Sequence, residues 1–221
     1  GGPEIRRMES GPTMTAARMA RGVIAMARGW KFDAVTIGYP GPVVADRPVR
    51  EPHNLGRGWV RFDFHVAFGR PVRMINDAAM QALGSYEGGK MLFLGFGTGL
   101  GSTLIAHAVI VPMELAHLPY RNATFEDYVG ESALERDGKR QWRQCVNDVV
   151  VRLTAAFEPD DVVLGGGNAR LLKGLPPRCR LGDNANAFTG GFRLWDAPAT
   201  VTPPPASRRS GATSSRPDTI R

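Results

Sequence analysis

Residues 91–117 constrain the fold more than any other part of the chain. An apolar run of strand length at 91–94 precedes a turn that is rich in glycine and contains Thr98. A second apolar run at 103–106 follows, so the pattern predicts a β-hairpin. Glycine has no Cβ, and adjacent backbone amides in such a turn form a concave site for an anion. The glycines of this turn are Gly95, Gly97, Gly99 and Gly101.

The spacing distinguishes this turn from two common phosphate motifs. The chain lacks the Gly-x-x-x-x-Gly-Lys-Ser/Thr loop, and the turn does not match the Gly-x-Gly-x-x-Gly pattern of dinucleotide-binding proteins. Glu114 and His117 follow downstream, three positions apart. This arrangement is typical of a sugar or phosphate site. A second interpretation stays open on spacing alone, because glycines also occur in hairpins where they serve only the turn.

Composition indicates a soluble globular protein. The chain has 221 residues, of which 43% are hydrophobic and 22% charged. No apolar run reaches the length of a membrane-spanning helix, and no signal peptide opens the sequence. Cys145 and Cys179 form neither a metal-binding spacing nor a disulfide framework, so we expect a cytoplasmic location with no membrane partner.

The net charge of +7 favours an anionic partner. A mild basic excess suits ATP or polyphosphate, and it also attracts nucleic acid weakly and without specificity. The sequence shows no platform of aromatic and basic residues for stacking bases. We therefore expect no specific nucleic-acid partner.

Hydrophobic periodicity predicts alternating helices and short buried strands. Thr13 or Thr15 is expected to cap the first long helix, and residues 5–8 are expected to form an edge strand. We expect strands at 33–38, 71–75 and 161–164. We expect helices at 16–26, 62–68, 77–84, 125–134, 139–157 and 182–191, and a helix through 169–172. Pro, Ser, Thr, Ala and Arg dominate residues 197–221, which are expected to be a disordered tail.

Several ordered motifs together resemble the ROK family of sugar kinases and repressors, in the hexokinase–actin superfamily. The resemblance covers roughly residues 30–195. Besides the glycine hairpin, the motifs that carry it lie at 38–43, 52–59, 72–77, 124–129 and 161–168. It implies a two-lobed α/β fold of the actin/hexokinase (ribonuclease H-like) type, with the active site in the cleft between the lobes. The expected lobes are 1–89 and 90–196.

The resemblance also implies an activity and its site. A ROK sugar kinase transfers a phosphoryl group from ATP with Mg²⁺, or from polyphosphate, to a hexose such as glucose. Asp77 falls on the family's catalytic base. The family's sugar-binding positions correspond to Asn54, Asn76, Glu114, His117 and Glu126. Its phosphate and nucleotide motifs correspond to Gly97, Thr98, Gly99, Gly101, Gly165, Gly166, Gly167 and Asn168. A homodimer is one possible assembly.

The chain departs from the family pattern in three places. It has no Asp-x-Gly-Gly-Thr phosphate motif, so the first lobe is expected to be incomplete at its start. Residues 118–124 contain no cysteine where many members carry a zinc motif, so we expect no structural zinc and no protein metal site. Ala116 replaces a family glycine.

These departures keep alternative interpretations open. One is a truncated family member that binds sugar without kinase activity. Another is a ROK-type transcription regulator, which the lack of a helix-turn-helix segment disfavours. For Asp77, a structural role as a helix N-cap is the competing interpretation, since Asp is common at strand-to-helix junctions.

Overall fold

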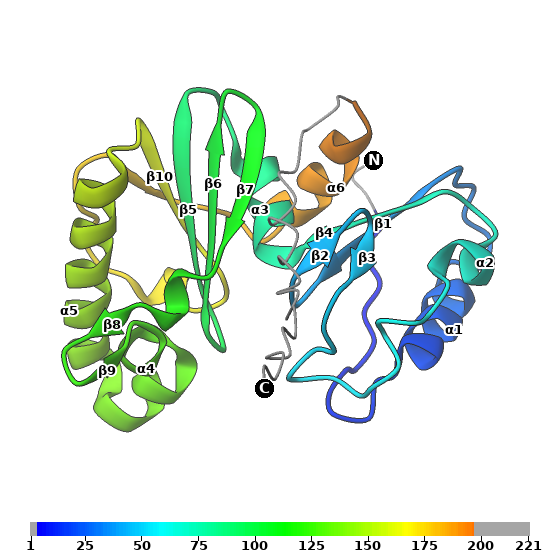
Figure 1. Cartoon of the computed structure of the whole chain (residues 1–221), viewed down its shortest axis with the longest axis horizontal. Helices are drawn as coiled ribbons and strands as arrows, with labels where there is room; N and C mark the ends of the chain where they lie inside the picture. Colours follow the sequence, from blue (N-terminus) through cyan, green and yellow to red (C-terminus); the bar gives the residue numbers. More distant parts are fainter. Residues whose placement is uncertain (1–3, 197–221) are drawn as a thin grey trace, which may run out of the picture.

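The chain forms two groups of elements with two helices between them, α3 (Asp77–Ser85) and α6 (Asn186–Asp196) (Figure 1). The computed structural model describes residues 4–196, and the predicted tail at 197–221 lies outside them. A two-stranded sheet anchors the first group and a five-stranded mixed sheet the second, which confirms the α/β fold class. Within residues 4–196, no helix is both long and apolar enough to cross a bilayer.

The first group, called the first lobe below, is built on a parallel pair of strands. Its elements are α1 (Ala16–Met26), β1 (Val35–Tyr39), β2 (Val43–Val44), β3 (Arg47–Pro48), α2 (Phe64–Phe68) and β4 (Val72–Asn76). β1 and β4 pair in parallel along all their residues. Tyr39, Trp59 and Phe64 are buried and pack as an aromatic core, with the Tyr39 and Trp59 ring centroids 5.6 Å apart.

The second lobe is built on a sheet with strand order β11-β10-β5-β6-β7. Its strands are β5 (Lys90–Phe96), β6 (Leu100–Ala106), β7 (Val109–Met113), β8 (Pro119–Tyr120), β9 (Ala123–Thr124), β10 (Asp161–Gly165) and β11 (Cys179–Leu181). Its helices are η1 (Leu115–His117), α4 (Glu126–Val129), α5 (Glu131–Phe157) and η2 (Ala169–Leu171). β5, β6 and β7 form an antiparallel meander, whereas β10 runs parallel to β5 and β11.

β5 is apolar on both faces because a helix covers each face of its sheet. Leu92 and Leu94 pack in the cluster that contains the buried side of α5, including Trp142. Met91 and Phe93 point to the opposite face and pack with α3. Alternate side chains of a strand point to opposite faces. The continuous apolar run that marked this strand in the sequence thus reflects burial on both sides.

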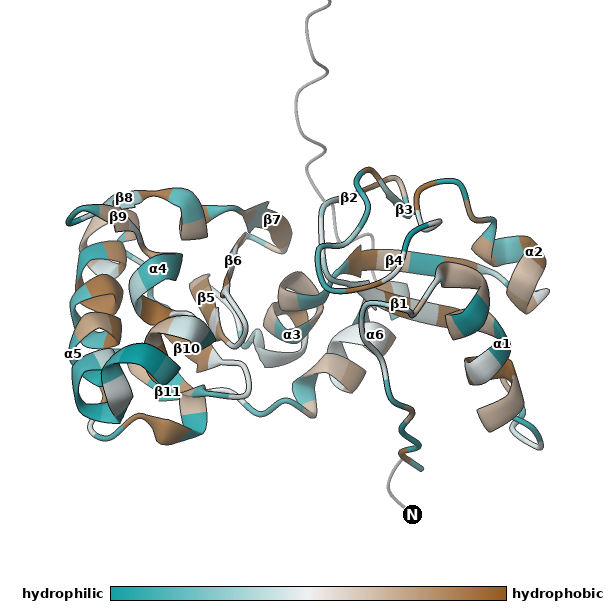
Figure 2. Ribbon diagram, turned by 90° about the horizontal axis from the view of Figure 1, so that it is seen from below, coloured by the Kyte–Doolittle hydropathy of each residue, from teal (hydrophilic) through white to brown (hydrophobic). Residues whose placement is uncertain are grey.

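α6 follows the second lobe along the chain but packs against α3 and β1. It lies beside α3 in both views (Figures 1 and 2). The Thr36 hydroxyl on β1 donates a hydrogen bond to the Gly191 carbonyl oxygen at 2.9 Å. The Trp195 indole N–H donates to the Thr36 hydroxyl at 2.7 Å. The end of the described chain is therefore fixed to the first lobe.

The structure confirms most predicted helices and corrects three elements. The Thr15 hydroxyl caps α1 by accepting from the Arg18 N–H at 3.3 Å. The predicted break before residue 139 is a kink at Gly138, whose φ is 75°. Three predictions are wrong: residues 5–8 form no strand, the closing helix spans 186–196 instead of 182–191, and only the three-residue η2 follows Asn168.

Candidate active site

The predicted glycine hairpin is confirmed, with a tight turn at residues 97–99 between β5 and β6. Within the turn, the Gly97 N–H donates to the Gly99 carbonyl oxygen at 3.1 Å. The N–H groups of Thr98 and Gly99 have no acceptor in the described part of the chain. Two neighbouring unpaired amides are the arrangement that binds an anion.

None of the hairpin glycines has a positive φ, so backbone conformation does not require glycine at these positions. Close contacts with neighbouring elements do require it at two of them. A Cβ on Gly101 would lie 2.8 Å from the Cβ of Ala78 in α3. A Cβ on Gly99 would lie 2.0 Å from the Glu126 Oε2 atom. The hairpin therefore touches the first turn of α3 on one side and the start of α4 on the other.

Asp77 is the first residue of α3, and Asn76 is the N-cap. The Asn76 Oδ1 atom accepts from the Ala79 N–H at 3.1 Å, and its Nδ2 group donates to the Gly41 carbonyl at 3.2 Å. Asn76 is therefore bonded at both ends within the protein. The N-cap interpretation of Asp77 is wrong, which leaves Asp77 available for another role.

The Asp77 carboxylate is held by the backbone at the start of α3. Its Oδ1 atom accepts from the Ala78 N–H at 2.8 Å, and apart from Asp77 itself no other residue of 4–196 donates a hydrogen bond to the carboxylate. Burial raises the pKa of Asp77, and hydrogen bonds from the backbone N–H groups of Ala78 and of Asp77 itself partly oppose that shift. A raised pKa brings a carboxylate closer to the range in which it serves as a general base near neutral pH.

Three predicted sugar-binding residues flank a small hairpin formed by β8 and β9. They are Glu114 and His117 before it and Glu126 after it. Glu114 immediately precedes η1 and His117 ends it, and both side chains are exposed. The Phe125 N–H donates to the Leu118 carbonyl oxygen at 3.0 Å, which closes the small hairpin and brings the end of η1 to the start of α4.

The turn at Gly165–Gly167 contacts the glycine hairpin directly. Gly166 has φ of 82°, and a Cβ there would lie 2.3 Å from the Phe96 carbonyl oxygen. The Asn168 N–H donates to the same oxygen at 3.0 Å, and the Asn168 Nδ2 group donates to the Gly97 carbonyl at 3.5 Å. The two predicted phosphate and nucleotide segments are therefore adjacent.

Asn54 is the predicted site residue that the structure does not connect to the others. It lies in an exposed loop of the first lobe and makes no hydrogen bond to any residue of 4–196. Gly56, two residues further along, fixes this loop to the first lobe, because the Gly56 N–H donates to the Met14 carbonyl at 3.0 Å.

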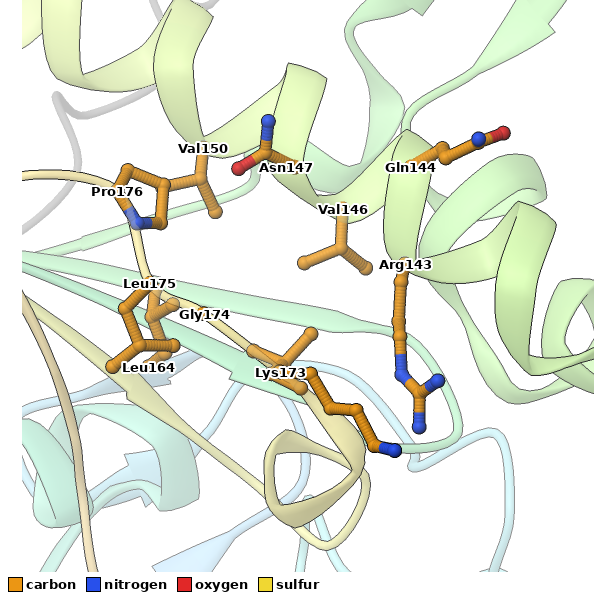
Figure 3. A pocket seen from close by; sticks show the side chains of 11 residues that line it. Arg143, Gln144, Val146, Asn147, Val150, Leu164, Lys173, Gly174, Leu175 and Pro176 are labelled. Atoms are coloured by element: carbon orange, nitrogen blue, oxygen red, sulfur yellow. The ribbon is translucent and has the colours of Figure 1, made fainter.

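A pocket of about 260 Å³ lies between α5 and residues 172–176 (Figure 3). Leu164, which directly precedes the Gly165–Gly167 turn, contributes to its apolar lining with Val150. The cationic groups of Arg143 and Lys173 lie at the same end of the pocket (Figure 3). The sequence interpretation missed these residues, because basic residues on an exposed helix face and in a loop form no recognisable motif.

Comparisons with known proteins identify sugar kinases as relatives of the chain. No family model matches the chain. It is 28% identical over 157 residues to a polyphosphate glucokinase of Mycobacterium tuberculosis, a match that covers 64% of this chain and 58% of the relative. The chain is thus similar in sequence to polyphosphate glucokinases. It spans little more than half the length of this curated relative.

Solved structures of sugar kinases have the same fold. An inorganic polyphosphate/ATP-glucomannokinase of Arthrobacter superposes with a TM-score of 0.67 at 23% identity, covering 81% of this chain and 82% of that one. A ROK family glucokinase of Streptomyces griseus, solved with glucose and AMPPNP, superposes with a TM-score of 0.65 at 17% identity, covering 81% and 88%. The predicted two-lobed hexokinase-type fold is thereby confirmed.

Proposed function

We propose that the chain transfers a phosphoryl group from ATP or polyphosphate to a hexose such as glucose. The observation that carries this proposal is the close approach of Gly101 to Ala78, which brings the helix start bearing Asp77 against the glycine hairpin. A proton acceptor beside an anion-binding turn is the combination that phosphoryl transfer to an alcohol requires. The kinase names of the relatives favour this activity over the regulator alternative.

Each group of residues has a proposed role in this reaction. Asp77 accepts the hydroxyl proton on its carboxylate as the hydroxyl oxygen attacks the terminal phosphorus, and ADP or a shortened polyphosphate leaves. Glu114, His117 and Glu126 bind sugar hydroxyls, since a carboxylate oxygen accepts hydrogen bonds from adjacent hydroxyls. Asn76 contributes by fixing the start of α3, and we retain Asn54 as a proposed sugar ligand from the first lobe.

The donor is proposed to bind across the two glycine turns. The free amides of Thr98 and Gly99 suit the transferred phosphoryl group. The Gly165–Gly167 turn and Asn168 stand next to them on the nucleotide side. For ATP, the pocket beside α5 has an apolar lining for the nucleoside and two cationic groups for phosphates.

Mg²⁺ is proposed to enter with the donor. This ion keeps several waters and takes one or two carboxylates together with substrate phosphates, so it needs no dedicated protein cage. Residues 4–196 hold no cluster of three His, Cys, Asp or Glu side chains placed to bind a metal. A structural zinc normally has four protein ligands. We therefore retain the prediction of no structural zinc, which elemental analysis of protein purified without a metal-affinity tag would test.

A coupled assay with glucose, magnesium ATP and polyphosphate tests the kinase proposal. Formation of glucose 6-phosphate from either donor supports it. Glucose binding by calorimetry without any transfer would favour the second candidate, a sugar-binding protein without kinase activity. We further propose a cytoplasmic location, which the free cysteines Cys145 and Cys179 suit, and a homodimer, which light scattering would test.

A further inference from the structure

Glu126 contacts the glycine hairpin as well as the region proposed for the sugar. Its Oε2 atom accepts a hydrogen bond from the Leu100 N–H at 3.3 Å. The carboxylate lies directly against Gly99, where a Cβ would approach Oε2 to 2.0 Å. A negatively charged group therefore occupies one side of the turn that is proposed to receive a phosphoryl group.

Backbone bonds hold Glu126 and the hairpin together. The Glu131 N–H donates to the Thr98 carbonyl oxygen at 3.2 Å, which ties the tip of the turn to the start of α5. The Gly130 N–H donates to the Glu126 carbonyl oxygen at 2.8 Å, which fixes α4 on the same junction. With both backbones fixed, the Glu126 side chain is the part that can move away from the turn.

The phosphoryl group of the donor and the hydroxyl groups of the sugar interact with the Glu126 carboxylate in opposite ways. A phosphoryl oxygen seeks the same kind of amide donor that Glu126 already uses at Leu100, and its negative charge is repelled by the carboxylate. Sugar hydroxyls are hydrogen-bond donors and attract the carboxylate. When a hexose binds Glu126, the carboxylate moves away from the hairpin, and the Leu100 N–H becomes free to donate to another acceptor.

We propose that Glu126 couples the two substrates: it hinders the donor in the sugar-free chain and admits it once a hexose engages the carboxylate. This inference rests on the proposed kinase function. It predicts that glucose tightens donor binding, and by thermodynamic reciprocity the donor tightens glucose binding by the same factor. It also limits transfer to water, because the donor binds well only when the sugar is present.

Calorimetry with magnesium AMPPNP, with and without saturating glucose, tests the coupling. We expect glucose to tighten AMPPNP binding to the wild-type chain by about 5- to 150-fold, the usual range of coupling between sites. Glu126→Gln removes the charge and Glu126→Ala removes the whole carboxylate. Both variants should bind AMPPNP without glucose more tightly than the sugar-free wild type does, by a similar factor.

Glu131→Gln is the matched control. It removes a carboxylate from the same segment, but the Glu131 side chain is exposed and makes no hydrogen bond within residues 4–196. This variant should keep the wild-type coupling factor. If glucose and AMPPNP both bind but do not affect each other, or if both Glu126 variants bind sugar-free AMPPNP as weakly as wild type, the coupling is refuted while the kinase proposal stands. If neither ligand binds, both proposals fall.

Discussion

Gly84 of α3 and Gly190 of α6 face each other where the two helices cross. A Cβ on Gly84 would lie 2.8 Å from the Gly190 backbone nitrogen, and a Cβ on Gly190 would lie 2.9 Å from the Gly84 nitrogen. Even closer, a Cβ on Gly190 would lie 1.8 Å from the Met80 carbonyl oxygen. The pair permits a backbone-to-backbone approach that no other residue allows, and it positions α6 against the helix that carries Asp77.

Gly190→Ala should therefore destabilise the folded chain. The added methyl group meets rigid backbone, and overpacking of this kind typically costs about 1–3 kcal/mol, occasionally more. Gly191→Ala is the control, because a Cβ there has its nearest neighbour at 3.6 Å and alanine favours a helix. Urea unfolding of both variants measures the difference. Equal stability of the two variants would contradict the close helix crossing.

Gly166→Ala should lower stability more than Gly167→Ala does. Gly166 has a positive φ, and its Cβ would collide with the backbone of Phe96, whereas a Cβ on Gly167 meets nothing within 4 Å. The left-handed conformation alone costs a non-glycine residue about 1–2 kcal/mol. We expect Gly166→Ala to lose at least about 2 kcal/mol in unfolding free energy. A smaller loss than in Gly167→Ala would show that the two turns are not packed as described.

Asp77→Ala should abolish phosphoryl transfer while sparing sugar binding more than Glu114→Ala does. Loss of a general base typically costs about a hundred- to ten-thousandfold in rate. Glu114 is proposed to accept hydroxyl hydrogen bonds that exist already in the ground state, so its loss weakens sugar binding. Paired kinetics and glucose calorimetry on the two variants separate these effects. Near-normal turnover of Asp77→Ala would refute the base assignment.

Asp77→Asn should be more stable than wild type at pH 7 and lose that advantage in acid. Burial raises the pKa of Asp77 above its ordinary value of 3.8, so the folded state holds this proton more firmly than the unfolded chain. The stabilisation from protonated Asp77 is thus complete below about pH 3.8 and lost as the pH rises through the folded pKa. Urea unfolding at several pH values measures the trend, with the exposed Asp33→Asn as control. A difference independent of pH would contradict it.

Asn147→Trp should impair the use of ATP more than the use of polyphosphate. Asn147 is exposed at the edge of the pocket beside α5, so an indole there obstructs the proposed nucleoside site without entering the core. Val151→Trp is the control, since Val151 is 49% exposed on the same helix and outside the pocket lining. We expect the KM for ATP to rise about tenfold or more, which is about 1.4 kcal/mol of binding, with turnover on polyphosphate unchanged. An equal effect on both donors would place the nucleoside elsewhere.

The sequence was sufficient for the long and strongly periodic elements and for the glycine hairpin. The sequence misplaced α6, because a pair of glycines at 190 and 191 usually indicates the end of a helix. Here the crossing with α3 requires Gly190 in the middle of the helix. The sequence also missed β2 and β3, which flank the turn at Ala45–Asp46, and β7, which follows the turn at His107–Ala108. These two-residue turns have positive φ at every position but lack the Asn-Gly or Gly-Gly pairs that usually signal them.

For the site, too, the sequence predicted local features but not the contacts between distant segments. Local patterns located the two glycine turns, and the resemblance proposed Asp77 as the base and named the sugar candidates, which stay predictions. What no pattern could indicate is which groups are already occupied: Asn76 as the actual N-cap, and Glu126 bonded to Leu100. These contacts join segments far apart in the chain and depend on how the lobes pack.

The chain passes between the lobes twice, directly from β4 into α3 and again through residues 182–185 into α6. A lobe connected to its neighbour at one point can rotate in any direction, whereas a lobe connected at two points rotates about the line that joins them. Asp77 lies at the first attachment, where such a rotation displaces atoms least, whereas the loop of Asn54 lies out in the first lobe. A rotation about that line would carry the loop of Asn54 through an arc while Asp77 remains almost stationary beside the glycine hairpin.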